Sequence, residues 1–244
     1  MAQPAHSERQ LSNQYSWLAL ALAAIAGAVD GTGYLLLYHV FTSHMSGNTV
    51  AMMIYVAGGN WHESWRHIEP IVIFFFGIVA GIALTDVLVA RRVARMFAVI
   101  AGLEFVLLIV FVVLAHPPQQ WMVVWPASAM GVQNAMLRRV GHYKVRTTFV
   151  TGMLTNTAQG LVETLQALFR RSDDAREKFS DFTFYGGIWL CFACGGILAA
   201  LIAIGHGTWA LLLPLSGLAV LIAYDLIAPV TKVPIEQASG EISG

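Results

Sequence analysis

Charged side chains are scarce in this sequence. They make up 11% of its 244 residues, whereas soluble domains usually carry about 25%. Hydrophobic residues account for 57%, and the mean hydropathy is +0.65. This composition excludes an ordinary soluble domain and predicts an integral membrane protein whose main partner is the lipid bilayer. The net charge of zero at pH 7 excludes the basic surface that nucleic-acid binding requires.

Cysteine is also scarce, with only Cys191 and Cys194 in one apolar run. A C-x-x-C pair can belong to a redox centre or form half of a metal site. Zinc takes about four ligands, and no second cluster of cysteine or histidine matches this pair. Small residues commonly pack membrane helices together. We therefore interpret the pair as packing residues and expect neither a metal nor another cofactor.

Known catalytic motifs are missing as well. The sequence has no H-E-x-x-H, no nucleophile elbow and no phosphate-binding loop. His44 and Ser46 are two residues apart, so on a helix they would point in different directions. No catalytic residue is assigned. A membrane enzyme that uses Asp30, His44 and Glu104 as acid–base groups stays open as an alternative.

Eight apolar segments follow one another along the chain. They cover residues 17–38, 42–57, 68–90, 96–114, 121–137, 147–169, 182–204 and 209–228. Crossing a bilayer takes about 20 residues, and segments 42–57 and 147–169 are too short or too polar to fit that description well. Residues 16–228 are predicted to form one membrane domain, between a disordered tail at 1–15 and a polar tail at 229–244.

The positions of lysine and arginine select a topology. If all eight segments crossed, the 14 basic residues would divide equally between the two sides. If segments 42–57 and 147–169 instead enter and leave on one side, Arg66 alone stands opposite the others. Cytoplasmic loops collect basic residues. We therefore predict six crossings, two re-entrant segments and both termini in the cytoplasm, in the inner (plasma) membrane.

The most unusual stretch covers residues 27–49. Asp30 lies among glycines in an apolar run, and the sequence FTSHMSGNT follows at 41–49. A carboxylate is costly in lipid, so it must face protein, water or a ligand. Polar segments broken by glycine are where membrane proteins build binding sites. This stretch is the predicted functional centre.

The stretch recurs in the second half of the chain. GVQN at 131–134 parallels GAVD at 27–30 with a spacing of 104 residues, and MLTNT at 153–157 parallels MSGNT at 45–49 with a spacing of 108. Two matching blocks in one order favour a duplication. The repeats are expected at about 16–115 and 121–228, and three crossings in each would invert the second relative to the first. The predicted fold class is an all-α, polytopic helix bundle with two inverted repeats.

A resemblance to a known family rests on four features: the G-x-x-D block, Tyr34, Phe41 and the S-G-N sequence at 46–48. At these positions the chain resembles the YoaK-like family of bacterial membrane proteins, from residue 17 to about residue 228. That family more often has threonine where this chain has Ser46, which also carries a hydroxyl group. The resemblance implies an integral membrane protein and supplies no substrate.

The candidate site residues share a polar or flexible character at membrane depth. We expect a substrate or ion pathway lined by Asp30, Tyr34, His44, Ser46, Gly47, Asn48, Thr49, Glu104, Asn134, Thr155 and Asn156. Each has a structural alternative. Asp30 could cap a helix break, the amides and hydroxyls could join helices, and Glu104 could be neutral or bonded to a neighbouring helix.

The repeated polar breaks in apolar segments indicate a class of function. The expected role is a small transporter or channel that moves an unidentified small polar solute or ion between the two repeats. An enzyme is disfavoured by the missing motifs, and a non-transporting assembly or regulatory protein by the repeated polar breaks. Assembly into a homo-oligomer is left open.

Overall fold

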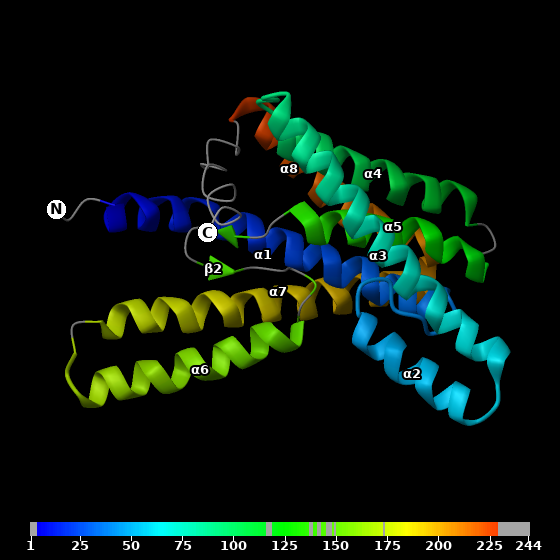
Figure 1. Cartoon of the computed structure of the whole chain (residues 1–244), viewed down its shortest axis with the longest axis horizontal. Coiled ribbons are helices and arrows are strands. Elements are labelled where there is room, and N and C mark those ends of the chain that lie inside the picture. Colours follow the sequence, from blue (N-terminus) through cyan, green and yellow to red (C-terminus); the bar gives the residue numbers. More distant parts are fainter. Residues whose placement is uncertain are drawn as a thin grey trace.

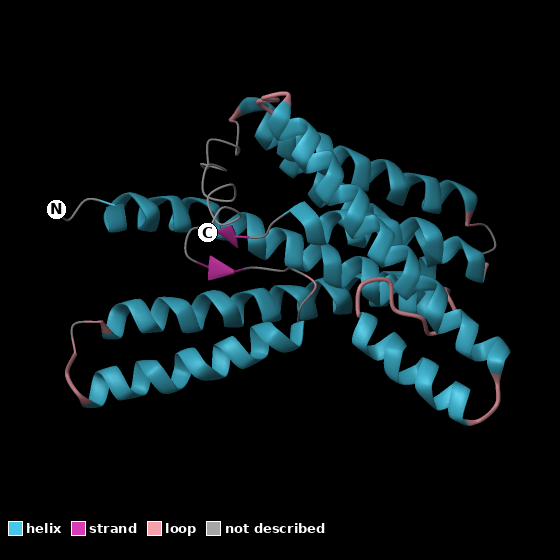
Figure 2. Cartoon of the chain, in the orientation of Figure 1, coloured by secondary structure: helices cyan, strands magenta, loops and turns pink. Residues whose placement is uncertain are grey.

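The computed structural model describes residues 4–115, 119–136, 139–140, 143–144, 148, 150–172 and 174–228. The predicted all-α class is confirmed, since helices dominate the described chain (Figure 2). They are α1 (Pro4–Leu36), α2 (Met45–Ala57), α3 (Trp61–Ala90), α4 (Met96–Leu114), α5 (Val124–Met136), α6 (Val150–Phe169), α7 (Ala175–His206) and α8 (Leu212–Ile227), with 3-10 turns η1 (Gln120–Val123) and η2 (Gly207–Leu211). Two short antiparallel strands, β1 (Arg139–Val140) and β2 (Tyr143–Lys144), pair in the register Arg139 with Lys144.

Long apolar helices mark the chain as a membrane protein. Four stretches of the described residues are long and apolar enough to cross a bilayer: Ser16–Leu36, Trp61–Ala90, Met96–Leu114 and Ala175–Ile227. Large apolar side chains remain uncovered on these helices, including Phe76 at 62% exposure and Ile204 at 77%. Such continuous apolar surface suits hydrocarbon and not water. The predicted membrane location is thereby confirmed.

The long helices lie roughly along one direction, with α1 passing through the middle of the bundle (Figure 1). α1 packs mainly on α7, α3 packs on α5, and α4 packs on both α5 and α8. Apolar side chains from α1, α4 and α8 meet in the core, among them Leu22, Leu108 and Leu218, each fully buried. The start of α1 and the end of α8 lie at the same end of the bundle.

Glycines allow α1 and α7 to touch backbone to backbone. A methyl group added at Gly27 would fall on the carbonyl oxygen of Phe192, and one added at Gly195 would fall on that of Ala24. Small residues at such crossings let two helices approach more closely than side chains would allow. These two helices therefore form the tightest part of the membrane core.

The same arrangement recurs between α5 and α3. A Cβ at Gly131 would lie 2.5 Å from the carbonyl oxygen of Phe74, and one at Gly77 would lie 2.7 Å from that of Ser128. The two crossings are related by fixed spacings. On α5, Gly131 and Ser128 lie 104 residues after Gly27 and Ala24 of α1 (131 − 27 and 128 − 24). On α7, Gly195 and Phe192 lie 118 residues after Gly77 and Phe74 of α3 (195 − 77 and 192 − 74).

α2 and α6 each lie against the helix that follows them in the chain. α2 has 13 residues, or about 20 Å at 1.5 Å per residue, which is less than the roughly 30 Å of a hydrocarbon core. α2 packs on α3, and α6 packs on α7 through a face that includes Gly160 and Thr164. Both begin near the middle of the long helices and run towards opposite ends (Figure 1).

Some boundaries differ from the sequence-based expectations. The tail predicted to be disordered at 1–15 is helical from Pro4 onward; proline suits the first turn of a helix because the amide hydrogen it lacks would be unpaired there. The short β1–β2 pair was not expected in an all-α chain. The predicted tail at 229–244 lies outside the described residues.

Candidate functional site

Asp30 organises the turn between α1 and α2. Its Oδ1 atom accepts hydrogen bonds from the backbone N–H of Thr42 (2.7 Å), the hydroxyl of Thr42 (3.0 Å) and the backbone N–H of Ser43 (2.8 Å). Asp30 is 5% exposed and lies six residues before the end of α1. Six helical residues span about 9 Å. The chain therefore turns back into the bundle by about that depth before α2 begins.

Asn48 holds the same turn from the other side. Its Oδ1 accepts from the N–H of Phe41 at 3.0 Å, and its Nδ2 donates to the carbonyl of Phe41 at 2.8 Å. Asn48 is fully buried. A Cβ at Gly47 would lie 2.8 Å from the Phe41 ring, so the absence of a side chain lets this ring sit against the first turn of α2. Asp30 and Asn48 are brought together by one loop.

The remaining candidates from the first half occupy varied positions. Tyr34 stacks against Phe41 with ring centroids 4.7 Å apart, and His44 lies 5.5 Å from the same ring. Thr49 donates its hydroxyl to the carbonyl of Met45 at 2.8 Å, within α2. Ser46 is exposed in the first turn of α2. An exposed hydroxyl at this depth is available to water or to a ligand.

The second half contains a matching polar bond. Thr148 donates its hydroxyl to Oδ1 of Asn134 at 3.2 Å, just as Thr42 does to Oδ1 of Asp30. Asn134 is partly buried near the end of α5. In both halves a threonine hydroxyl thus bonds a side-chain oxygen near the end of one helix, α1 or α5, to the segment before the next helix, α2 or α6, with an amide in place of the carboxylate.

The two asparagines that the sequence comparison pairs differ in burial. Asn48 is fully buried in α2, whereas Asn156 is partly exposed in α6. The side chain buried in the first described turn of α6 is that of Met153. Asn156 therefore does not occupy a position like that of Asn48.

Two more candidates lie apart from this turn. Thr155 is exposed and donates its hydroxyl to the carbonyl of Thr151 at 3.1 Å, within α6. Glu104 is fully buried in α4, and neither carboxyl oxygen has a hydrogen-bond partner among the described residues. Ionised and unpaired, such a carboxyl group would be costly to bury. Glu104 therefore forms a separate polar position within the helix core.

Asp225 is a buried carboxylate that was not among the site residues expected from the sequence. Its Oδ2 accepts from the backbone N–H of Ala98 at 3.0 Å, and its own carbonyl accepts from Arg95. Asp225 is fully buried near the end of α8. It therefore caps the start of α4, where amide groups lack partners within the helix. Among the described residues, no group of three or more His, Cys, Asp and Glu side chains could hold a metal ion.

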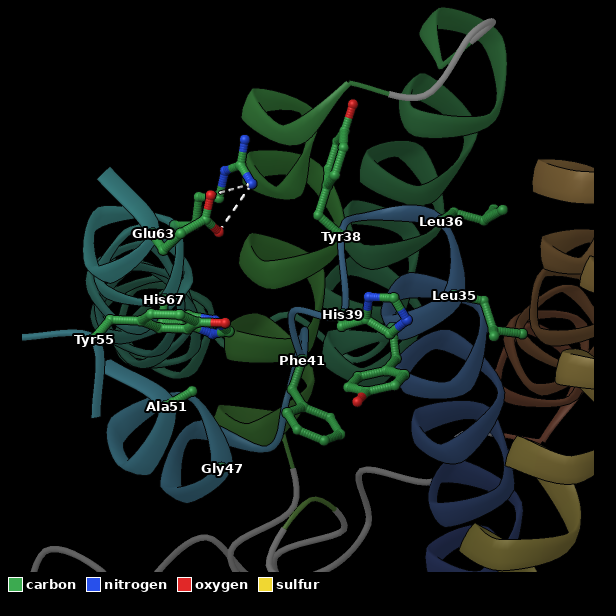
Figure 3. A pocket seen from close by; sticks show the side chains of 12 residues that line it. Leu35, Leu36, Tyr38, His39, Phe41, Gly47, Ala51, Tyr55, Glu63 and His67 are labelled. Carbon is green, nitrogen blue, oxygen red and sulfur yellow. Dashed lines mark hydrogen bonds and ion pairs between the residues drawn. The ribbon is translucent and has the colours of Figure 1, made fainter. Parts of the chain in front are cut away.

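A cavity of about 610 Å³ opens beside the turn, between the end of α1, α2 and the start of α3 (Figure 3). It is rich in aromatic rings and contains one ion pair, Glu63 with Arg66 at 2.7 Å. Its lining is Tyr34, Leu35, Leu36, Tyr38, His39, Phe41, Gly47, Ala51, Tyr55, Glu63, Arg66 and His67. Tyr34 and Gly47 are the predicted site residues that it includes.

The sequence analysis missed most of this lining. Tyr38 and His39 are consecutive non-glycine residues with φ of 58° and 62°, in the left-handed region that such residues rarely adopt. The rings of Tyr55 and His67 stack at 5.5 Å. These residues come from separate elements and share no local motif. The one signal in the sequence was the position of Arg66, which the predicted topology places on the opposite side of the membrane from the other basic residues.

Comparison with known proteins agrees with these observations. A family model described as "Protein of unknown function (DUF1275)" matches residues 18–224. The UPF0700 transmembrane protein YoaK of Bacillus subtilis (strain 168) is 24% identical over 144 residues, which cover 57% of this chain and 64% of that protein. The matched stretch therefore spans less than two thirds of that relative. No solved structure matches the chain. The resemblance seen in the sequence is confirmed, and the chain belongs to the DUF1275 family of proteins of unknown function.

Proposed function

We propose that this protein is a small-solute or ion transporter or channel of the inner (plasma) membrane, with a polar route between two inverted repeats. The observation that carries the proposal is the matched pair of glycine crossings. The contact of Gly27 with Phe192 is matched by the contact of Gly131 with Phe74. Gly131 lies 104 residues after Gly27, and Phe192 lies 118 residues after Phe74. Chance would not reproduce two such contacts with the same spacings.

The helix order supports an inverted relation between the repeats. The first repeat would use α1, α3 and α4 to cross the membrane. The second would use α7, α8 and the continuous segment formed by η1 and α5, residues 120–136, which is longer than α2. Three crossings place the second repeat upside down relative to the first. α2 and α6 then become the re-entrant elements, each starting at mid-depth and leaving on its own side (Figure 1). Transporters and channels recurrently combine inverted repeats with broken helices that meet a substrate near the midplane.

The chemistry of the route would come from the two turns. Asp30 and Thr42 face the first short helix, and Asn134 and Thr148 precede the second. The start of a helix carries partial positive charge from unpaired amides, and the hydroxyl of Ser46 lies there. Of the two matching hydrogen-bonded pairs, Asp30 with Thr42 contains an ionisable side chain and Asn134 with Thr148 does not. The proposed route is therefore asymmetric, with a carboxylate in one half and an amide in the other.

Topology gives the first test of the six crossings. Reporter fusions after Arg95, Arg146 and Lys178 should all report the cytoplasm, because basic residues collect there. A fusion at Gly59, in the turn between α2 and α3, should report the outer side. An outer-side signal after Lys178 would mean that α6 crosses the membrane, and six crossings would be wrong.

Reconstitution tests transport itself. Liposomes that contain the purified full-length protein should take up at least one member of a panel of protons, alkali cations, small anions and amino acids faster than protein-free liposomes. The rate should scale with the amount of protein. If every member of the panel enters at the protein-free rate, the proposed transport of a small solute or ion loses its support.

A further inference from the structure

The cavity beside α2 has chemistry that the proposed route does not use. Six of its lining residues carry rings, and they come from α1, the following turn, α2 and α3: Tyr34, Tyr38, His39, Phe41, Tyr55 and His67. Its volume of about 610 Å³ lies within the range of roughly 300–1,000 Å³ that is typical of small-molecule sites. Aromatic walls favour a flat apolar ligand, because rings stack face to face or edge to face.

Two buried nitrogen atoms in this cavity lack partners among the described residues. They are Nδ1 of His67, a side chain only 7% exposed, and Nε of Arg66. Buried polar atoms in native proteins are nearly always hydrogen-bonded. Both residues line the cavity. Both atoms are covered by neighbouring atoms, so a ligand would reach them after those side chains shift. A ligand with acceptor oxygens would then satisfy Nε of Arg66, which is always a donor, and Nδ1 of His67 in its protonated tautomer.

The ion pair leaves one edge of the arginine available. Both oxygens of Glu63 bind the same nitrogen, Nη1 of Arg66, at 2.7 and 2.9 Å. The Arg66 guanidinium also lies over the Tyr38 ring at 5.1 Å. The Nε edge of a guanidinium matches the spacing of two carboxylate oxygens. The cavity thus combines an oriented donor edge with a ring-lined wall.

The turn that carries Tyr38 and His39 is held in an uncommon backbone conformation. Two successive non-glycine residues in the left-handed region are strained and persist where the surroundings require them. Their φ angles are 58° and 62°. His39 packs edge-on against Tyr34 at 5.1 Å. This conformation places the rings of Tyr38 and His39 in the lining of the cavity (Figure 3).

We propose that this cavity binds a small aromatic carboxylate, with its ring against Tyr34, Tyr55 and His67 and its carboxylate on the Nε edge of Arg66. Glu63 is the carboxylate in the lining, and both of its oxygens are already bonded to Arg66, so the donor edge that remains selects an acceptor group on the ligand. An anion without a ring would leave the aromatic wall unused. Under the proposed topology the cavity faces the outer side of the membrane. Binding at this cavity does not require transport and can fail or succeed independently of it.

Calorimetry on the full-length protein in detergent micelles tests this proposal, with benzoate as the probe and blank micelles subtracted. Benzoate should bind more tightly than benzyl alcohol, which lacks the charge, and than acetate, which lacks the ring. Arg66→Gln should weaken benzoate binding about tenfold or more, since a hydrogen bond to a charged group contributes on the order of 1.5–3 kcal/mol. Tyr55→Leu should also weaken it while keeping an apolar side chain.

Arg91→Gln is the matched control, because Arg91 lies at the far end of the same helix and is exposed. It should bind benzoate like the wild type. Absence of benzoate binding to the wild type, or equal binding to Arg66→Gln, would overturn the proposal. Benzyl alcohol binding as tightly as benzoate would also overturn it, by showing a site for neutral rings. If Arg66→Gln does not fold, Tyr55→Leu decides: unchanged benzoate affinity in that variant contradicts the aromatic site.

Discussion

Replacing Gly27 by alanine is expected to prevent stable folding. The added methyl group would coincide with the carbonyl oxygen of Phe192. Because this is a contact between two backbones, no side-chain rotation can relieve it, and α1 must move away from α7. The loss of unfolding free energy should exceed about 4 kcal/mol, a size reached only when core packing fails. Thermal unfolding and size-exclusion profiles of the purified protein would measure it.

Gly102→Ala is the control for this change. Gly102 also lies within a membrane helix, but a Cβ there would meet no atom within 4 Å. Alanine is more favourable than glycine inside a helix by about 0.8–1 kcal/mol, so this variant should be as stable as the wild type or slightly more so. If Gly27→Ala were as stable as Gly102→Ala, the close crossing of α1 and α7 would be refuted.

Replacing Asp30 by asparagine is expected to abolish transport while the protein stays folded. Asparagine keeps an Oδ1 acceptor for the amides of Thr42 and Ser43, and it caps helices about as well as aspartate. The charge alone is removed. Intramembrane carboxylates are costly and mark ion or substrate pathways. The uptake rate in liposomes should fall to the protein-free level, with a loss of stability of about 1–2 kcal/mol at most.

Two further variants separate charge from capping. Asp30→Ala removes all three hydrogen bonds and should lose both transport and stability, because two buried amides are left without a partner. Asp86→Asn alters an exposed aspartate of α3 and should change neither. Wild-type uptake by Asp30→Asn would instead assign Asp30 a purely structural role as the cap of the α1–α2 turn.

Composition and apolar runs were enough to predict the helical class and the membrane location. Segment 42–57 stood out as too short to cross, and α2 occupies nearly the same residues. The turn centred on Asp30 was also foreseeable, since a carboxylate in an apolar run must find donors. What the sequence could not decide was whether that carboxylate serves as a cap, as the hydrogen bonds of Thr42 and Ser43 show, or also as part of a pathway.

Other features depend on contacts between distant segments. The aromatic cavity is assembled from three elements with no common spacing, so nothing local connects Tyr38, Tyr55 and His67. Asp225 caps α4 from a position 127 residues away from its partner Ala98. The parallel between the polar blocks at 45–49 and 153–157 was visible in the sequence, but it could not predict that Asn48 is fully buried while Asn156 is partly exposed.

The most direct measurement of a polar route is the reactivity of a single cysteine at position 46. In a background with Cys191 and Cys194 replaced by alanine, Ser46→Cys should react with a membrane-impermeant thiol reagent, because the first turn of α2 would face water within the membrane. Val106→Cys, on the exposed apolar face of α4, should not react, since a thiol in hydrocarbon stays protonated. Reaction at position 46 alone is the result expected of a route that reaches the start of α2. Equal protection of both positions, with both labelled only after denaturation, would contradict it.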